Sequence, residues 1–345
     1  MSPVGSVPAG VRRILVIKLR AIGDVLLSTI VLKNLRLAFP DAAVDFLTES
    51  PSATLLRRTL DRGEVVVYDR RAMTGLDLIR RVRSGSYDLV IDLFGNPRTA
   101  LVTRLSGAPH RVGYRFRGRT YAYTTVVTPR GGEVHNTQFN LDALEAIGVP
   151  IRDRTVSLHL GDQDRRTAET FLAGSCSGPG MLVALNPSGG WYTKRWSLEK
   201  FAALGDRLVD RFKAQIILPW GPGELSDVEK IQRAMRHAAV IPPETTLLEL
   251  AGLLERMAFV VTNDSGPMHL AAAVGTPVLG IYGPTNPMLQ GPYGDRHRTI
   301  RLDGLECLGC NLTRCPIGHV CMRDLTVERV GDAVEQLMND LGIHQ

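Results

Sequence analysis

Two glycine-rich patterns that mark common nucleotide sites are absent from this chain of 345 residues. No G-x-G-x-x-G follows the first apolar run, so the fingerprint of a dinucleotide-dependent dehydrogenase is missing. No G-x-x-x-x-G-K-S/T occurs, which argues against P-loop chemistry. Aromatic residues make up only 6%, and no basic strand set is rich in them. An RNA-reading sheet stacks bases on aromatic side chains, so no nucleic-acid partner is expected.

Signals for secretion or membrane insertion are also scarce. The longest charge-free stretch, residues 265–294, holds six Gly and five Pro and cannot form a spanning helix. Residues 1–10 lack charged side chains and an apolar segment, so we expect a disordered tail and not a signal peptide. Five Cys, four of them near the C-terminus, do not form the pattern of a secreted disulfide framework. The sequence therefore predicts a cytoplasmic protein, peripheral to a membrane at most.

Positive charge is concentrated in the first half of the chain. Residues 1–165 carry 24 Lys+Arg against 16 Asp+Glu, whereas residues 166–345 carry 17 against 19. This asymmetry favours an anionic partner on the N-terminal side. Nucleic acid, anionic lipid headgroups and phosphorylated sugars all fit the charge alone, and so does a solvated arginine-rich surface.

Apolar runs alternate with amphipathic helical patterns, which predicts parallel sheets covered by helices on both faces. Two such series stand in tandem, so we expect two doubly wound α/β domains, at residues 11–165 and 166–345. Ligands bind outside the carboxyl ends of such strands, and the expected site is the cleft between the domains. Expected strands span residues 14–19, 44–48, 65–68, 89–93, 181–186, 216–219, 258–262 and 277–282; expected helices include residues 25–39, 198–212 after a cap at Ser197, and 332–341.

The most informative segment is Asp264-Ser265-Gly266, between an expected strand and an expected helix. A strand that leads straight into a helix presents free backbone N–H groups, which suit a diphosphate. His269 lies one turn into this helix, either as a neutral packing residue or as a contact to the ligand.

The turn after the first strand contains Gly23 and Asp24. Gly23 lets the backbone turn tightly, and Asp24 then lies at the start of a helix. Asp24 is either an ordinary helix cap or a general base at the edge of the site.

Residues 186–196 follow the first strand of the second series. Ser188 and Gly189 can bring backbone close to a ligand, while Lys194 and Arg195 supply fixed positive charge that can stabilise a departing diphosphate. The alternative is a surface basic pair beside two packing tryptophans. Glu224, after the next strand, could bind ribose hydroxyls or simply favour a helix N-terminus.

The last candidate site is a cluster of four cysteines with the spacing C-x2-C-x4-C-x5-C, and His319 lies inside it. The C-x2-C pair fits a zinc knuckle, but the longer spacings are looser than those of common structural zinc sites. A structural zinc ion, disulfides and buried thiols all remain open, and catalytic use is least expected. The four residues are Cys307, Cys310, Cys315 and Cys321.

Together these motifs resemble glycosyltransferase family 9, the bacterial lipopolysaccharide heptosyltransferases, in order along nearly the whole chain. Residues 18–24 are similar to the family's N-terminal loop with its Gly-Asp pair, and residues 186–196 to its Asn-Pro…Lys-Arg/His-Trp segment. Residues 264–269 are similar to its Asp-Ser/Thr-Gly-x-x-His signature, and residues 283–285, Gly-Pro-Thr, follow it. The cysteine segment is similar to that of many members called heptosyltransferase II.

The resemblance implies a GT-B fold, in which two Rossmann-like domains face each other across a cleft. It implies that the C-terminal domain binds ADP-L-glycero-D-manno-heptose and that an inner-core saccharide on lipid A lies against the N-terminal domain. Contact with the anionic inner face of the inner membrane is expected as well.

We predict a single inverting displacement, in which Asp24 is the general base and Lys194 contacts the departing diphosphate. We expect the chain to lack the Asp-x-Asp pair on which metal-dependent sugar transfer commonly relies, so no divalent ion is expected in the chemical step. Any zinc would be structural. The predicted donor-binding residues are Ser188, Gly189, Thr193, Arg195, Glu224, Asp264, Ser265, Gly266 and His269; the predicted acceptor-binding residues are Lys18, Arg20, Arg115 and Arg117.

Other functions share parts of this pattern. A GT-B transferase or epimerase acting on another nucleotide sugar would have the same fold. A non-catalytic nucleotide-sugar sensor would need the phosphate site but no base, and Asp24 argues against it.

Overall fold

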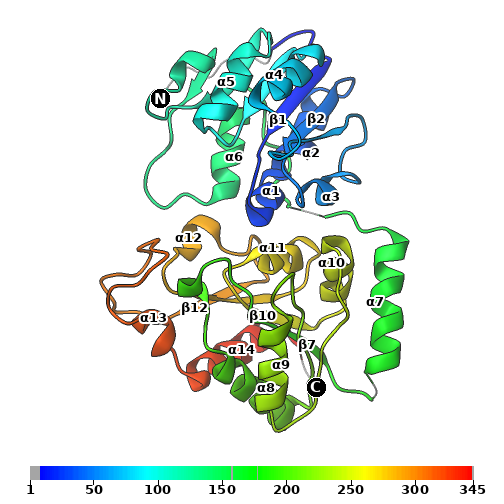
Figure 1. Cartoon of the computed structure of the whole chain (residues 1–345), viewed down its shortest axis with the longest axis vertical. Helices are drawn as coiled ribbons and strands as arrows, with labels where there is room; N and C mark the ends of the chain where they lie inside the picture. Colours follow the sequence, from blue (N-terminus) through cyan, green and yellow to red (C-terminus); the bar gives the residue numbers. More distant parts are fainter. Residues whose placement is uncertain (1–7, 157, 177, 344–345) are drawn as a thin grey trace. The chain divides into compact units, whose positions relative to one another are not determined.

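The computed structural model describes residues 8–156, 158–176 and 178–343. The chain divides into two compact units, Met1–His159 and Leu160–Gln345 (Figure 1). Residues 1–7 of the predicted tail lie outside the described residues. The boundary predicted after residue 165 falls inside helix α7 (Asp162–Ser175), the first helix of the second unit.

The first unit is built on a six-stranded parallel sheet in the order β3-β2-β1-β4-β5-β6. Its central strand, β1 (Arg13–Ile17), is buried at four of five positions, as a strand covered on both faces requires. The strand order reverses between β1 and β4, so the carboxyl ends of these strands flank a crevice. The other strands are β2 (Ala43–Thr48), β3 (Val65–Val67), β4 (Leu89–Asp92), β5 (His110–Tyr114) and β6 (Thr125–Val127).

Helices cover both faces of this sheet. Right-handed crossovers place α1, α2 and α6 on one face, where they pack together, and α4, α5 and the short helix η1 on the other. The bounds are α1 (Ile22–Ser28), α2 (Ile30–Ala38), α3 (Ala53–Leu56), α4 (Gly75–Ser84), α5 (Pro97–Leu105), η1 (Thr120–Ala122) and α6 (Asn136–Glu145).

The single helix predicted over residues 25–39 is two helices, and the prediction was wrong at this point. The break lies at Thr29, which ends α1 and begins α2. The hydroxyl groups of Ser28 and Thr29 donate to the carbonyls of Val25 and Leu26, each at 2.7 Å. Side chains that bond back to the preceding turn compete with the helix ladder, which explains the interruption.

The second unit repeats the same architecture. Its parallel sheet has the order β12-β11-β10-β7-β8-β9, and the order reverses between β7 and β10. The predicted two doubly wound α/β domains are thus confirmed. Strand β12 has an arginine at each end and was not predicted, because it lacks an apolar run. The strands are β7 (Leu182–Asn186), β8 (Gln215–Ile217), β9 (Ala239–Val240), β10 (Phe259–Asn263), β11 (Val278–Tyr282) and β12 (Arg298–Arg301).

Several helices of the second unit begin at residues whose side chains cap the first turn. The hydroxyl of Ser197 accepts a hydrogen bond from Lys200 N, which confirms the predicted cap. Thr326 caps the last helix, which begins at Val327, five residues before the predicted position. No helix in the described parts of the chain has the length and apolar composition needed to cross a bilayer. The helices are η2 (Tyr192–Lys194), α8 (Leu198–Phe212), α9 (Leu225–Ala234), α10 (Leu247–Glu255), α11 (Gly266–Ala273), α12 (Pro287–Gln290), α13 (Val320–Arg323) and α14 (Val327–Leu341).

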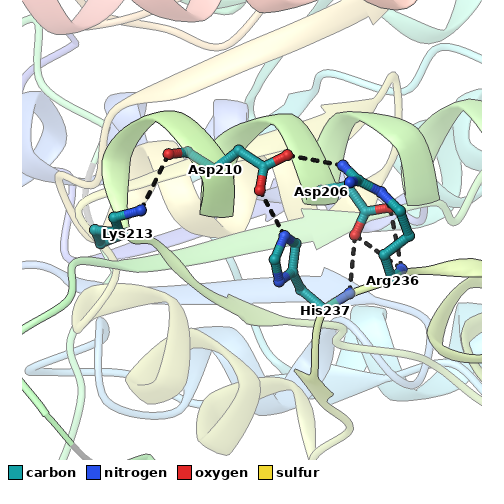
Figure 2. Close-up of polar contacts among 5 residues, drawn as sticks. All are labelled: Asp206, Asp210, Lys213, Arg236 and His237. Carbon is teal, nitrogen blue, oxygen red and sulfur yellow. Dashed lines mark hydrogen bonds and ion pairs between the residues drawn. The ribbon is translucent and has the colours of Figure 1, made fainter.

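A polar cluster fixes the segment between α9 and the edge strand β9 to helix α8 (Figure 2). The buried carboxylate of Asp206 accepts the backbone N–H groups of Arg236 and His237 at 2.9 and 3.0 Å. One turn on, Asp210 accepts hydrogen bonds from both side chains, and these bonds lower the pKa of Asp210, with Arg236 the larger cause. The buried carboxylate is therefore satisfied by backbone donors, as burial of a charge requires.

Helix α10 approaches α7 closely at Gly252. A Cβ atom on Gly252 would lie 2.7 Å from the carbonyl oxygen of Asp164, which is backbone and cannot move aside cheaply. We therefore expect Gly252→Ala to destabilise the second unit by about 1–3 kcal/mol, measured by urea unfolding.

Gly174→Ala in α7 is the matched control, because nothing lies within 4 Å of a Cβ atom at that position. In a helix, Ala is favoured over Gly by roughly 0.5–1 kcal/mol, so this variant should be as stable as the parent or more stable. Equal stability of the Gly252→Ala variant would contradict the close packing.

Candidate functional site

In the first unit, the turn after β1 holds Asp24 in a fixed position. Asp24 is the third residue of α1, and its Oδ2 accepts the backbone N–H of Ala21 at 3.2 Å. Its Oδ1 accepts the side-chain amide of Asn136, at the start of α6, at 2.6 Å. The carboxylate is half-buried. Two donors thus hold an ionised carboxylate in one orientation, which a general base requires.

Lys18 lies beneath this carboxylate and is buried, with 6% of its surface exposed. Its Nζ donates to the carbonyl of Leu93, after β4, at 3.2 Å. Burial lowers the pKa of Lys18, and the charges of Asp24 and Asp92 oppose that shift. The ammonium group therefore ties the two strand ends together and stabilises two carboxylates, instead of projecting into solvent.

Asp92 is a second carboxylate at this sheet edge. It is fully buried, and burial raises its pKa. Hydrogen bonds from Gly95 N, Tyr123 and Phe94 N act in the opposite direction and lower the pKa. The Tyr123 hydroxyl donates to Asp92 Oδ2 at 2.9 Å. Because the hydrogen bonds of Asp92 with described residues are all internal, Asp92 organises the loop after β4 and is not placed to meet a ligand.

Three arginines predicted to bind an acceptor lie in turns at the carboxyl ends of strands. Arg20 follows β1, and Arg115 and Arg117 follow β5; all three are exposed. Arg115 Nε donates to Thr128 Oγ1 at 3.3 Å, whereas no carboxylate of the described residues pairs with any of the three. They present positive charge at the edge of the sheet that carries Asp24.

In the second unit, α11 begins directly after β10 and its N-terminus is not capped. Ser265 is the N-cap residue, with extended backbone and no hydrogen bond from its side chain to the first turn. The first N–H groups of a helix have no partner within it, and Pro267 removes one of them. The remaining groups and the helix dipole form an anion site of the predicted kind. His269 is buried one turn further on.

Lys194 and Asp264 form an ion pair beside this N-terminus. Lys194 Nζ lies 2.7 Å from Asp264 Oδ2, and both side chains are largely buried. Thr285 Oγ1, after β11, donates to the same carboxylate oxygen at 2.7 Å. Lys194 Nζ also lies 4.6 Å from the ring centroid of Trp191. An ammonium group has three donors, so this arrangement fixes Lys194 and leaves N–H groups for a ligand.

Side-chain amides join the ends of β7 and β10. Asn186 Nδ2 donates to Thr262 Oγ1 at 2.9 Å and to Ser265 Oγ at 3.2 Å, and its Oδ1 accepts the hydroxyl of Ser188 at 2.7 Å. Asn263 Nδ2 donates to the carbonyl of Pro187 at 2.7 Å. This network holds the loop that carries Ser188 against the start of α11.

Several predicted donor-site residues make internal contacts. Arg195 Nε donates to the carbonyl of Gly189 at 2.9 Å, so Arg195 braces the glycine turn. Glu224 Oε2 accepts Gly221 N at 2.9 Å, while no described residue bonds its other oxygen. The buried hydroxyl of Thr193 donates to the carbonyl of Leu312 at 2.8 Å. The structure thus brings Lys194, Asp264 and α11 together and gives Thr193 and Arg195 supporting contacts.

The cysteine segment packs beneath the turn that carries Lys194. Cys307, Cys310, Cys315 and Cys321 all line one cavity of about 130 Å³, together with Thr193 and His319. His319 Nε2 donates to the carbonyl of Thr193 at 2.5 Å, and His319 N donates to Cys315 Sγ at 3.2 Å. All five cysteines are free thiols. Through Thr193, the segment supports the position of Lys194.

The structural zinc ion, one of the alternatives that the cysteine spacing left open, gains no support from these contacts. Within residues 8–156, 158–176 and 178–343, no group of three or more His, Cys, Asp or Glu side chains is placed to hold a metal ion. The chain does contain one Asp-x-Asp triplet, at residues 162–164, but it starts α7. There Asp164 Oδ2 accepts Gly161 N at 2.9 Å, which is the contact of a helix cap.

Sequence reasoning missed two residues that touch the predicted ones. Asn136 lies 112 positions from Asp24, and nothing in the spacing of the chain signals their contact. Thr285 could have been found, because it ends the Gly-Pro-Thr motif after β11, at the same sheet edge as Asp264.

The profile of glycosyltransferase family 9 (heptosyltransferase) matches residues 76–321. One curated relative is lipopolysaccharide heptosyltransferase 3 of Escherichia coli (strain K12). It is 29% identical over 290 residues, covering 79% of this chain and 82% of the relative.

Solved structures show the same fold. The glycosyl transferase family 9 structure from Veillonella parvula DSM 2008 aligns with a TM-score of 0.82 and 24% identity, over 95% of this chain and 97% of that chain. The structure of E. coli ADP-heptose LPS heptosyltransferase II aligns with a TM-score of 0.76 and 23% identity, over 96% and 99%. The predicted GT-B fold class is confirmed by these likenesses.

The contact between Thr193 and the cysteine segment predicts thiol reactivity. Cys321 is buried and burial raises the pKa of its thiol, whereas Cys310 is exposed, so a disulfide reagent should modify Cys310 first and Cys321 last. Thr193→Val removes the bond to Leu312, worth about 1 kcal/mol, and should accelerate modification of Cys321 roughly fivefold.

Thr167→Val on α7 is the control, since the Thr167 hydroxyl donates to the carbonyl of Gln163 in its own helix and to no other described residue. The modified cysteines are identified by mass spectrometry of the peptides at successive times. Identical rates for Cys321 in the parent and in the Thr193→Val variant would show that this contact does not hold the segment.

Proposed function

The chain belongs to glycosyltransferase family 9 (heptosyltransferase) and is a glycosyltransferase, and we propose that it transfers L-glycero-D-manno-heptose from ADP-heptose to the inner core of lipopolysaccharide with inversion. One observation carries the proposal. The uncapped N-terminus of α11 lies beside the ion pair of Lys194 and Asp264, at the point where the strand order of the second sheet reverses. That is where open α/β sheets bind nucleotides.

We assign binding of the sugar donor to the second unit. The α11 backbone and the two remaining N–H groups of Lys194 bind the diphosphate of ADP, with Ser188 close to Ser265 through Asn186. Glu224 has one carboxylate oxygen without a described partner, so it can accept a ribose hydroxyl. Arg195 and Thr193 position the loop, and Asp264 positions Lys194. His269 supports the first turn of α11.

We assign binding of the acceptor to the first unit, which also supplies the general base. Asp24 removes the proton from an acceptor hydroxyl, whose oxygen attacks the anomeric carbon from the face opposite ADP. The bond from the anomeric carbon to the diphosphate oxygen breaks, through an oxocarbenium-like transition state. The electron pair leaves with ADP, and Lys194 and the α11 N–H groups stabilise the negative charge. Arg20, Arg115 and Arg117 bind the anionic substituents of the acceptor, and Lys18 stabilises ionised Asp24.

Fixed protein charges support transfer without a divalent ion, because Lys194 and α11 occupy the role that a metal fills in metal-dependent transfer. The Asp-x-Asp triplet at residues 162–164 is a helix cap, at the start of a helix and not at the end of a strand. The lipid-linked acceptor supports a cytoplasmic enzyme that works at the inner face of the inner membrane.

The deciding experiment measures ADP release from ADP-heptose by the full-length protein, with and without heptose-deficient lipopolysaccharide, in excess EDTA. Acceptor-dependent release is expected. Release only after a divalent metal is restored would refute metal independence. Release from a UDP-sugar but not from ADP-heptose would move the chain to another donor within the same fold.

The hydrogen bond from Asn136 to Asp24 predicts that changes at these two residues lower turnover by different amounts. Asp24→Ala removes the base and should lower kcat by about 10² to 10⁴. Asn136→Ala only frees the carboxylate to rotate, so it should lower kcat by roughly tenfold and leave the KM for ADP-heptose nearly unchanged. Gln138→Ala on the same helix is the control, because Gln138 bonds Asp142 and Arg154 but not Asp24. Near-parental turnover of Asp24→Ala would exclude it as the base.

Lys194 provides a test of the donor site that needs no acceptor. A hydrogen bond to a charged group is worth about 1.5–3 kcal/mol, so Lys194→Met should weaken ADP binding by roughly tenfold to a hundredfold in calorimetry. Lys230→Met is the matched control on α9, since Lys230 is exposed and Asp227 is its one ion-pair partner among the described residues. Unchanged ADP affinity of the Lys194→Met variant would remove Lys194 from the diphosphate site.

A further inference from the structure

One part of the first unit carries only positive charge. Residues 93–132 contain seven arginines and no Asp or Glu. This stretch forms α5, β5, η1, β6 and the loops between them. No carboxylate among the described residues forms an ion pair with Arg98, Arg104 or Arg119, whereas many other arginines of this unit do have such partners. Arg130, near the end of the stretch, pairs with Asp142 and Glu145, whereas no acid among the described residues neutralises Arg98, Arg104 or Arg119.

The outer face of α5 also exposes leucines. Its buried residues, Ala100, Val102 and Thr103, face the sheet, whereas Leu101 and Leu105 are 43% and 37% exposed. These leucines lie one turn apart on the same face, and Arg98 and Arg104 flank them at helical spacing. Such a face, apolar in the middle with arginines at its margins, is the pattern of a helix that lies in a membrane interface.

Helix η1 extends this face. Ala122 and Tyr123 pack on Ala100 of α5 in a small buried cluster, while the adjoining Tyr121 is 57% exposed. Arg111 links the two elements, since its Nε donates to the carbonyl of Ala122 at 3.0 Å and its Nη1 to that of Ala108. Figure 1 shows α5 beside α4 on the outside of the first unit. We call the set Arg98, Leu101, Arg104, Leu105 and Tyr121 the α5–η1 surface.

We propose that the α5–η1 surface docks on a lipid bilayer that carries anionic headgroups. This inference rests on the proposed function to the extent that the acceptor is attached to a lipid. The arginines complement the headgroup charge, and each is expected to strengthen partition about fivefold near an anionic surface. Leu101, Leu105 and Tyr121 enter the boundary between headgroups and acyl chains, while arginine side chains extend along that boundary with their charge in water.

Other anionic partners fit this surface less well. A free phosphorylated sugar needs hydrogen-bond donors, but it gains nothing from two leucines between them. Single-stranded RNA binds through several stacking aromatics, and the surface offers only Tyr121. Scattered exposed leucines are ordinary, such as Leu37 on the opposite face of the sheet. Three exposed apolar side chains on adjoining elements, within a stretch free of acids, are not scattered.

The test measures co-sedimentation of the full-length protein with vesicles of phosphatidylcholine alone and of phosphatidylcholine with phosphatidylglycerol. Binding should favour the anionic vesicles and weaken as salt is raised. Leu101→Gln with Leu105→Gln should reduce partition by roughly tenfold or more, and Arg98→Gln with Arg104→Gln by about 25-fold. Gln keeps the helix propensity of these positions, and circular dichroism checks the fold.

The control variants Leu37→Gln and Arg57→Gln carry the same changes on the opposite face, where Leu37 and Arg57 are also exposed. They should bind vesicles as the parent does. With a delipidated, water-soluble acceptor, turnover of the surface variants should equal that of the parent, which separates this proposal from the proposed function. The inference is overturned if the surface variants bind anionic vesicles like the parent, if the controls lose binding equally, or if the surface binds single-stranded RNA in place of vesicles.

Discussion

The proposed donor site depends on the side-chain amide of Asn263. This residue is fully buried at the end of β10, and it donates to the carbonyl of Pro187 while it accepts the backbone N–H of Trp196 at 3.1 Å. The loop between those positions carries Ser188 and Lys194. Because Trp196 also anchors in the core, with its indole N–H bonded to the carbonyl of Leu325, the loop has little freedom. Lys194 can therefore meet Asp264 without a metal or a ligand to hold it.

Burial and pairing divide the charged residues of both sites into two kinds. Lys18 and Asp92 are enclosed. Burial lowers the pKa of Lys18 and raises the pKa of Asp92, which in each case favours the neutral form. They hold strand ends together and shape the electrostatic surroundings of Asp24. The arginines after β5 remain exposed, so they can exchange water for a ligand. A charged residue in a sequence motif is thus a candidate for contact with substrate only when its position leaves it accessible.

The sequence predicted the fold well because its signal is local. Buried parallel strands such as β1 and β10 are continuous apolar runs, and the turns that follow them contain Gly, Asp and Ser. It missed β12, whose edge position tolerates charged residues, and the break at Thr29, which depends on two side-chain hydroxyls. The motif residues assigned to the proposed site rest on the same local signal, and their roles stay predictions. Asn136 was not, since a contact across 112 positions exists only after the sheet has formed.

The repeated strand order has a consequence for how such a chain can diversify. In both units the sheet reverses at its first strand, and the residues assigned to substrates lie in the turns beyond it. Under the proposed function, acceptor contacts come from turns of the first unit and donor contacts from turns of the second. Mutations that retarget the acceptor can therefore accumulate without disturbing recognition of the activated sugar. Related enzymes can inherit one donor and still build different branches of a glycan.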